Sequence, residues 1–143
     1  MIFDRTNLFS DGQAITASAA STNLIDLGAT GTPVGGSAIV RDIGPGSDIP
    51  VMVTVTESFN TLTSLTISVQ TDDNAAFSSA KTVFTTPAIL LADLAVGAKR
   101  NLLPDSIPLG TNERYVRLYY TVAGSNPSTG KITAGVVAAR QTN

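Results

Sequence analysis

The sequence holds only one pair of adjacent carboxylates, in the stretch Asp72-Asp73-Asn74. Oxygen-bearing side chains of this kind can bind a divalent cation or act as paired acids and bases. A calcium-binding loop, however, follows the pattern D-x-[DN]-x-[DN]-G with a glutamate at its twelfth position, and this stretch has neither the glycine nor the glutamate. Asp and Asn also favour turns, because their side chains accept hydrogen bonds from nearby backbone amides. We therefore interpret the stretch as a turn between two strands, and we predict neither a metal site nor a catalytic site there.

Three residue types with versatile chemistry are missing from the chain. Its 143 residues include no His, no Cys and no Trp. Without His or Cys, the Ser-His-Asp and Cys-His arrangements and a typical zinc site are excluded. The remaining acids are scattered, and few aromatic rings are present to stack on a sugar. We expect no enzyme, no cofactor and no metal. A small hydrolase that depends on Asp72 and Asp73 stays open as a rival hypothesis.

Charge is sparse and evenly spread. Charged residues make up 14% of the chain, the net charge is -2, and the nine Lys and Arg residues form no cluster. Nucleic-acid binding needs clustered cations, so we expect no nucleic-acid partner. We also expect no membrane span and no signal peptide, and therefore a soluble protein made in the cytoplasm. The surface of short uncharged side chains suits packing against another protein, but it equally fits an ordinary β-protein.

Apolar and polar residues alternate with a period of two, which is typical of strands that bury one face. Val116, Leu118 and Tyr120 show the pattern most clearly, and they alternate with polar or amphipathic residues. Segments 28–37 and 43–48 are rich in Gly and Pro and are predicted to be loops between strands. The predicted strands are 13–16, 22–27, 49–56, 64–71, 81–86, 88–94, 114–122 and 131–139.

These elements predict an all-β protein. Eight short strands with turn signals between them are typical of a sandwich or barrel, and no amphipathic helix pattern competes except for a helical turn within 85–99. We predict an antiparallel two-sheet jelly-roll sandwich, with an immunoglobulin-like β-sandwich as the alternative. The single domain is expected to span residues 13–143 and to follow an N-terminal arm of residues 1–12.

The predicted arm is one candidate contact surface. It carries four apolar side chains ahead of the first predicted strand, namely Ile2, Phe3, Leu8 and Phe9. Such an arm either folds back over its own sheet or reaches a neighbouring subunit.

The polar face of strand 114–122 is the second candidate contact surface. It presents Tyr115, Arg117 and Tyr119 on one side of the strand. Tyr and Arg are enriched in protein interfaces, although the same residues also occur on an ordinary exposed strand.

Three stretches of the sequence, taken in order, resemble one known family. They are NLFSDGQAITASAASTNLIDLG at 7–28, LTISVQTDDNAAF at 65–77 and RYVRLYYTVAGSNPSTGKITAGVVAARQ at 114–141. Together they resemble the capsid cement, or decoration, proteins of short-tailed bacteriophages, and FSDGQAIT followed by STNLIDLG is the most distinctive part. The resemblance implies a jelly roll on the outer surface of a capsid, often as a homo-oligomer over a symmetry axis.

The resemblance implies a function that agrees with the expectations from composition. The protein would be a virion structural protein, made in the host cytoplasm, that binds the outer surface of the assembled capsid and cements neighbouring subunits. Its partners would be the major capsid protein and other copies of itself, as a dimer or trimer, without nucleic acid or membrane. Two alternatives stay open. One is a virion-surface module that binds carbohydrate or a receptor, and the other is a head-completion or tail protein.

Overall fold

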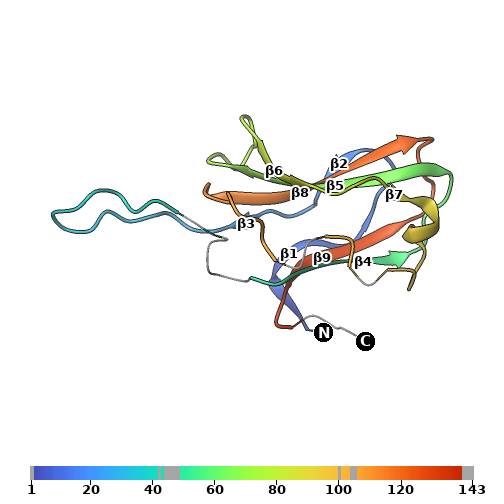
Figure 1. Ribbon diagram of the computed structural model, residues 1–143, viewed down its shortest axis with the longest axis horizontal. Helices are drawn as coiled ribbons and strands as arrows, with labels where there is room; N and C mark the ends of the chain where they lie inside the picture. The colour runs from blue at the N-terminus through green and yellow to red at the C-terminus, as the bar shows by residue number, and fades with distance from the viewer. Residues whose placement is uncertain (1, 42, 44–48, 100, 104–105, 140–143) are drawn as a thin grey trace.

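Two antiparallel β-sheets pack face to face in the computed structural model (Figure 1), which describes residues 2–41, 43, 49–99, 101–103 and 106–139. One sheet has the strand order β1-β9-β4, and the other has the order β2-β8-β5-β6, with β3 also paired to β8 and β7 to β5. The strands are β1 (Phe3–Ala14), β2 (Ala19–Ala20), β3 (Ile25–Asp26), β4 (Val51–Glu57), β5 (Leu62–Asp72), β6 (Lys81–Thr85), β7 (Ile89–Leu90), β8 (Tyr115–Gly124) and β9 (Lys131–Val137).

The pairing of early strands with late strands makes this sandwich a jelly roll. β1 pairs with β9, β2 and β3 pair with β8, and β5 pairs with β6. Beside β4 runs an irregular segment in which Leu102 N–H donates to Val53 O and Ile107 N–H donates to Ile49 O. An immunoglobulin-like sandwich would instead keep its last two strands as neighbours. The predicted fold class is confirmed, and the observed strand order is that of the jelly roll.

The core lies between the two sheets and follows the predicted alternation. Along β8, Val116, Leu118 and Tyr120 are buried, while the residues between them are only half-buried. β4 and β5 contribute valines, leucines and isoleucines from the facing sheets to the same apolar cluster. One residue departs from the alternation, because Met52 lies on the face of β4 opposite the core valines and is also buried. It pairs with Gly135 of β9.

The N-terminal residues form a strand and not the predicted arm. β1 begins at Phe3 and pairs with β9, so a separate arm over residues 1–12 is wrong. Phe9 is 2% exposed and lies in the core. Leu8 is buried on the opposite face against Gly135, where an added Cβ would lie 2.7 Å from Leu8 Cδ2. Of the two alternatives considered for these residues, packing on the chain's own sheet is confirmed.

A bulge in β1 explains why the sequence pattern missed this strand. The pairing with β9 shifts register between Phe3 and Leu8. In that interval the Asp4 carboxylate accepts hydrogen bonds from the backbone N–H and the hydroxyl of Thr6 and from the amide of Asn7. The four polar residues of this bulge interrupt the two-residue period, so the strand cannot be recognised by alternation alone.

A short chain of polar side chains ties the two sheets together inside the core. The Tyr120 hydroxyl of β8 lies 2.8 Å from the Ser10 hydroxyl of β1, and Ser10 donates to Gln13 Oε1. Gln13 in turn donates to Ala20 O and accepts from Thr22 N–H. Burial raises the pKa of Tyr120, although the hydrogen bond with Ser10 opposes this shift, so the phenol stays protonated. The Ser10 and Tyr120 hydroxyls and the Gln13 amide therefore all have hydrogen-bond partners, which polar groups inside an apolar core require.

Two other predicted elements differ in detail from the structure. The apolar run 88–94 forms the short strand β7 followed by a 3-10 helix, η1 (Leu91–Leu94), which is the helical turn expected there. The small-residue run before 22–27 forms β2, where no strand was predicted. Most of the predicted loop 43–48 lies outside the described residues. No helix among the described residues is long and apolar enough to cross a membrane.

The burial of Phe9 leads to a stability prediction. Replacing Phe9 with Ala removes a core aromatic side chain, and we expect unfolding to become easier by about 3 to 5 kcal/mol. Ile2 is 71% exposed, so Ile2→Ser should change stability by no more than about 0.5 kcal/mol. Urea denaturation of the two variants beside the original protein measures both values. Equal and small effects would contradict the placement of β1 in the core.

Candidate functional site

The outer face of β8 carries an ordered array of arginine and aromatic side chains. Tyr115, Arg117 and Tyr119 lie on this face and are each half-buried, as the alternation predicted. Arg117 Nε donates a hydrogen bond of 2.8 Å to Gln70 Oε1 on β5. The guanidinium carbon lies 4.1 Å from the centre of the Phe77 ring and 5.9 Å from that of Tyr119. Cation–π stacking and the hydrogen bond together hold Arg117 in one geometry.

Phe77 reaches Arg117 because the loop after β5 is closed by one carboxylate. Asp72 is fully buried, and its two oxygens accept hydrogen bonds from Asn74 N–H, Ser79 N–H and the Ser79 hydroxyl. The loop turns sharply at Phe77, whose φ of 52° lies in the left-handed region that glycine favours. The ring is 8% exposed, so it forms the apolar support beneath the guanidinium.

The two adjacent carboxylates therefore have different environments. Burial raises the pKa of Asp72, but the hydrogen bonds from Asn74 and Ser79 outweigh burial and lower the pKa overall. Asp73 is exposed, and its hydrogen bond with the neighbouring Asp72 raises its pKa. The predicted turn is confirmed: Asp72 organises the loop between β5 and β6. Across the described residues, no three Asp or Glu side chains come together as a metal site.

Among the described residues, three hollows on the surface of the sandwich are large enough to consider as binding sites. One, of about 370 Å³, lies beside Arg117 and Phe77 and is bordered by residues 20–24. A second, of about 430 Å³, lies where residues 28–30 and 39–41 meet the segment before β8. The third, of about 410 Å³, is mostly apolar and lies between the edge strands β6 and β7 and residues Leu102 and Leu103. We call the outer face of β8 with Tyr115, Arg117 and Tyr119 the Arg117 face. The first two hollows flank the same end of this face.

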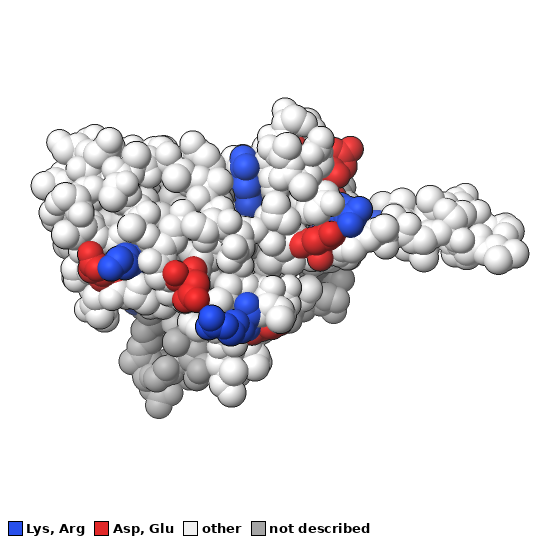
Figure 2. Space-filling view, turned by 180° about the vertical axis from the view of Figure 1, so that it is seen from behind, with Lys and Arg blue, Asp and Glu red and all other residues white. Residues whose placement is uncertain are grey.

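A long loop projects from the domain at this end. It comprises residues 28–41, follows β3, and extends well beyond the sandwich (Figure 1). Residues 28–40 contain no charged side chain, and Figure 2 shows the projection free of blue and red atoms while charges gather at its base. Three of its aliphatic side chains are exposed to solvent, namely Val34, Ile39 and Val40. We call residues 28–41 the projecting loop.

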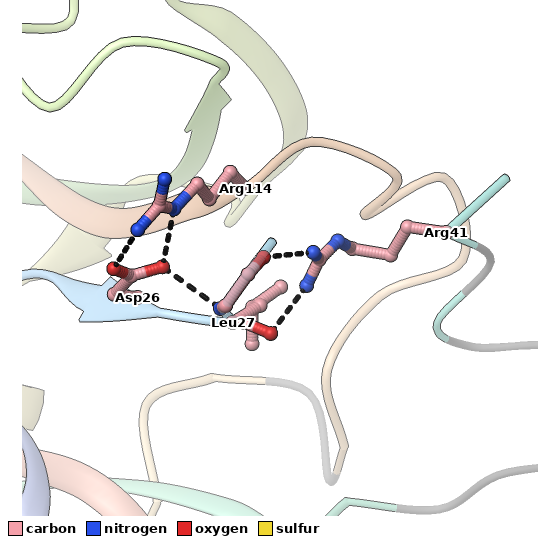
Figure 3. A network of polar contacts seen from close by, with 5 residues as sticks. Asp26, Leu27, Arg41 and Arg114 are labelled. Carbon is pink, nitrogen blue, oxygen red and sulfur yellow. Dashed lines mark hydrogen bonds and ion pairs between the residues drawn. The ribbon is translucent and has the colours of Figure 1, made fainter. Parts of the chain in front are cut away.

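A network of polar contacts fixes the base of the projecting loop (Figure 3). Arg41 donates hydrogen bonds to Leu27 O, at 2.7 Å, and to Gly28 O, which joins the two ends of the loop. Asp26 accepts two hydrogen bonds of 2.8 Å from Arg114 and one from Gly28 N–H. These bonds, led by the one from Arg114, lower the pKa of Asp26 from 3.8 to about 2. The loop therefore leaves the domain from a defined position on β3 and β8.

Of the two contact surfaces predicted from the sequence, the structure contains one and not the other. Tyr115, Arg117 and Tyr119 share one exposed face, as expected. The four apolar residues of the supposed arm do not form a surface, because two are buried, Phe3 is half-buried, and Ile2 alone is well exposed. A contact role for Leu8 and Phe9 is wrong for this reason.

The sequence analysis missed two parts of the site. Phe77 was not among the residues predicted for a contact surface, and its position under Arg117 depends on loop geometry that no local pattern reveals. Residues 28–37 were read only as a glycine-rich loop. The signal that was available is the length of this segment and its lack of charge, since long loops without secondary structure are usually functional.

The salt-bridged geometry of Asp26 leads to a titration prediction. Because its folded pKa lies below the unfolded value of 3.8, the pair adds stability that is complete above about pH 5 and is lost as the pH falls through 3.8 toward 2. NMR titration of the Asp26 carboxyl should give a midpoint near 2, and Arg114→Gln should move this midpoint upward. Lys99→Gln is the control, because Lys99 pairs with the distant Asp93. A midpoint near 3.8 in the unmodified protein would contradict the geometry.

The different environments of the acidic pair lead to a second prediction. Asp72→Ala removes the buried acceptor of three hydrogen bonds that close the loop, so the melting temperature should fall by several degrees. Asp73→Ala, at an exposed neighbouring position, should change it little. Differential scanning calorimetry compares the two variants directly. A larger effect at Asp73 than at Asp72 is the opposite of what the hydrogen bonds predict.

Comparison with known proteins agrees with the extent of the domain. A family model described as Bbp16 matches residues 9–140, from within β1 to beyond the end of β9. The match spans both sheets, the Arg117 face and the projecting loop. No curated protein matches the chain. On the strength of the family match over most of its length, the chain belongs to the Bbp16 family.

Proposed function

We propose that the protein is a virion structural protein that binds the outer surface of an assembled phage capsid and cements neighbouring subunits of the major capsid protein. The resemblance of residues 7–28, 65–77 and 114–141 to capsid cement proteins motivates this proposal. The jelly-roll fold is the one that this resemblance implies. The partners are the major capsid protein and other copies of the chain, and the protein resides on the outer surface of the virion.

The observation that carries the proposal is the preformed Arg117 face. Arg117 is held between Phe77 and Tyr119 and bonded to Gln70 on a flat, two-layer scaffold. Its terminal amino groups make no hydrogen bond within the described part of the chain, so they are free to donate to a partner. Arginine and tyrosine that are already immobilised lose little conformational entropy on binding, which favours a protein contact at this face.

The low charge of the chain supports the same function. Only 14% of the residues are charged, and the surface consists largely of short uncharged side chains. Each contact with a shell can then be modest, because neighbouring contacts on a repeating lattice act together and raise the effective concentration. A total buried area of about 1,600 Å² per partner contact is the typical size for a specific interface.

A co-sedimentation experiment tests the proposal. Purified protein is mixed with capsids assembled from the major capsid protein of the same phage or prophage, and bound copies are counted after pelleting. We expect hundreds of copies per shell and saturation at a fixed ratio to capsid subunits. Arg117→Ala should weaken binding by about tenfold or more, as expected for a buried interface arginine. Lys99→Ala, whose side chain forms an ion pair elsewhere, is the control.

Other outcomes point to the alternative functions. A few copies per particle would indicate a head-completion or tail protein. Binding to a glycan array without binding to capsids would indicate a carbohydrate- or receptor-binding module. Either result would refute the cement function. Size-exclusion chromatography with light scattering on the same sample determines whether free copies associate as a dimer or trimer.

A further inference from the structure

We propose that the projecting loop, residues 28–41, is a docking arm that lies on an uncharged site of the capsid surface beside the contact made by the Arg117 face. This inference rests on the proposed cement function, and it identifies a second contact that the comparisons do not assign. The observations that carry it are the exposure of the loop, the few hydrogen bonds of its described backbone, its fixed base and its continuity with the Arg117 face.

The loop presents apolar side chains that the domain does not bury. Val34 is fully exposed at 107%, Val40 is 81% exposed and Ile39 is 54% exposed. Exposed aliphatic side chains contribute no stability to the domain. Their burial against a partner lowers the free energy in proportion to the apolar area covered. No charged residue lies among residues 28–40, so a complementary site is uncharged as well.

The backbone of the loop is also largely free to pair. Two hydrogen bonds close it internally, from Gly36 N–H to Pro33 O at the tip and from Ile39 N–H to Gly31 O. The flanks of the loop lie in no described strand. An extended segment with free N–H and C=O groups can add to the edge of a sheet or lie in a furrow of another protein. The seven residues from 28 to 34 reach up to roughly 20 Å from the base when extended.

The base of the loop limits the entropy that docking must remove. Arg41 bridges the two ends through Leu27 O and Gly28 O, and the Asp26–Arg114 pair anchors the preceding strand to β8 (Figure 3). A loop with a fixed root explores fewer directions than a free tail of the same length. Less conformational entropy is then lost when the tip binds.

The loop and the Arg117 face form one continuous surface. β3, which leads into the loop, pairs with Val116 and Tyr115 at the start of β8. Arg117 follows on the same strand, and the hollows of about 370 and 430 Å³ lie beside this junction. A partner that covers the Arg117 face therefore also contacts the base of the projecting loop. The tip of the loop extends this contact beyond the domain. Because the proposed cement function places the capsid at the Arg117 face, this continuity makes the capsid the expected occupant of the loop.

A second copy of the chain is a weaker candidate for the occupant. Three aliphatic side chains do not supply the roughly 800 Å² per partner that a stable dimer buries. The loop therefore acts as an accessory contact for a molecule that is also held through another face. A lattice of capsid subunits provides both contacts at once, and linking them raises the overall affinity. The apolar hollow at Leu102 and Leu103 is where a second copy would have to receive the loop, and the experiment includes that outcome.

The first test is a pair of matched double variants in the capsid co-sedimentation assay. V34S/V40S keeps the length of the loop and removes its two most exposed aliphatic side chains. L90S/V96S removes two aliphatic side chains that are each 58% exposed near β7 and η1. We expect V34S/V40S to weaken capsid binding by at least about tenfold and L90S/V96S to leave it unchanged. Equal melting temperatures show that both variants are folded.

The second test locates the partner by photo-crosslinking. Because the chain has no cysteine, Val34→Cys and Val96→Cys each create a single site for a benzophenone label. The label at position 34 should crosslink to the major capsid protein, and the label at position 96 should not. Arg41→Gln, which opens the root of the loop, should reduce the yield at position 34.

The outcomes separate this inference from the proposed function. If the unmodified protein binds capsids, V34S/V40S binds equally well and position 34 gives no crosslink to the shell, the docking arm is wrong and the cement function stands. If position 34 crosslinks only to another copy of the chain, the occupant is a second copy and the inference is overturned. If the unmodified protein does not bind capsids, both proposals fail.

Discussion

The alternation of side chains along β8 is the constraint on which the fold and the candidate interface both depend. β8 is paired with β5 at ten positions, and its other edge pairs with β2 and β3. This register sends Tyr120 into the core and Arg117 outward. A shift of one residue would exchange the two faces and bury a guanidinium in an apolar core, which is strongly unfavourable. The core thus fixes which side of the strand is available for binding.

Loops at both ends of the sandwich are organised by polar side chains that bond to the backbone. Asp72 holds the loop that delivers Phe77 to the Arg117 face, and Asp26 holds the start of the projecting loop. At the opposite end, Asn60 Oδ1 accepts from Ser128 N–H and Thr129 N–H. Most of these acceptors lie at strand ends, where backbone donors have no sheet partner. A chain with few charged residues can therefore still have well-defined loops, because a single carboxylate fixes the backbone of each of these two loops.

The resulting surface differs from that of a protein that binds through electrostatic attraction. Three of its ion pairs, Arg114–Asp26, Lys131–Glu57 and Lys99–Asp93, neutralise charges locally. What remains exposed is an ordered arginine with aromatic neighbours and a loop of short uncharged residues. Contacts of this kind gain affinity from burial and shape, and salt screens them little. A rigid block with an extended loop is suited to a lattice that offers the same sites many times.

The sequence alone determined the fold class, the two faces of β8 and the turn at Asp72, because strand alternation and Asx turns are local properties. Tertiary structure decided the rest. The bulge at residues 4–7 hid β1 from any periodic pattern, and Phe9 became a core residue only when β9 provided a neighbour. The stacking of Phe77 under Arg117 joins residues 40 positions apart, and the root of the projecting loop needs Arg114 from a distant strand. Contacts between segments far apart in the chain depend on how the sheets pair, which local preferences do not specify.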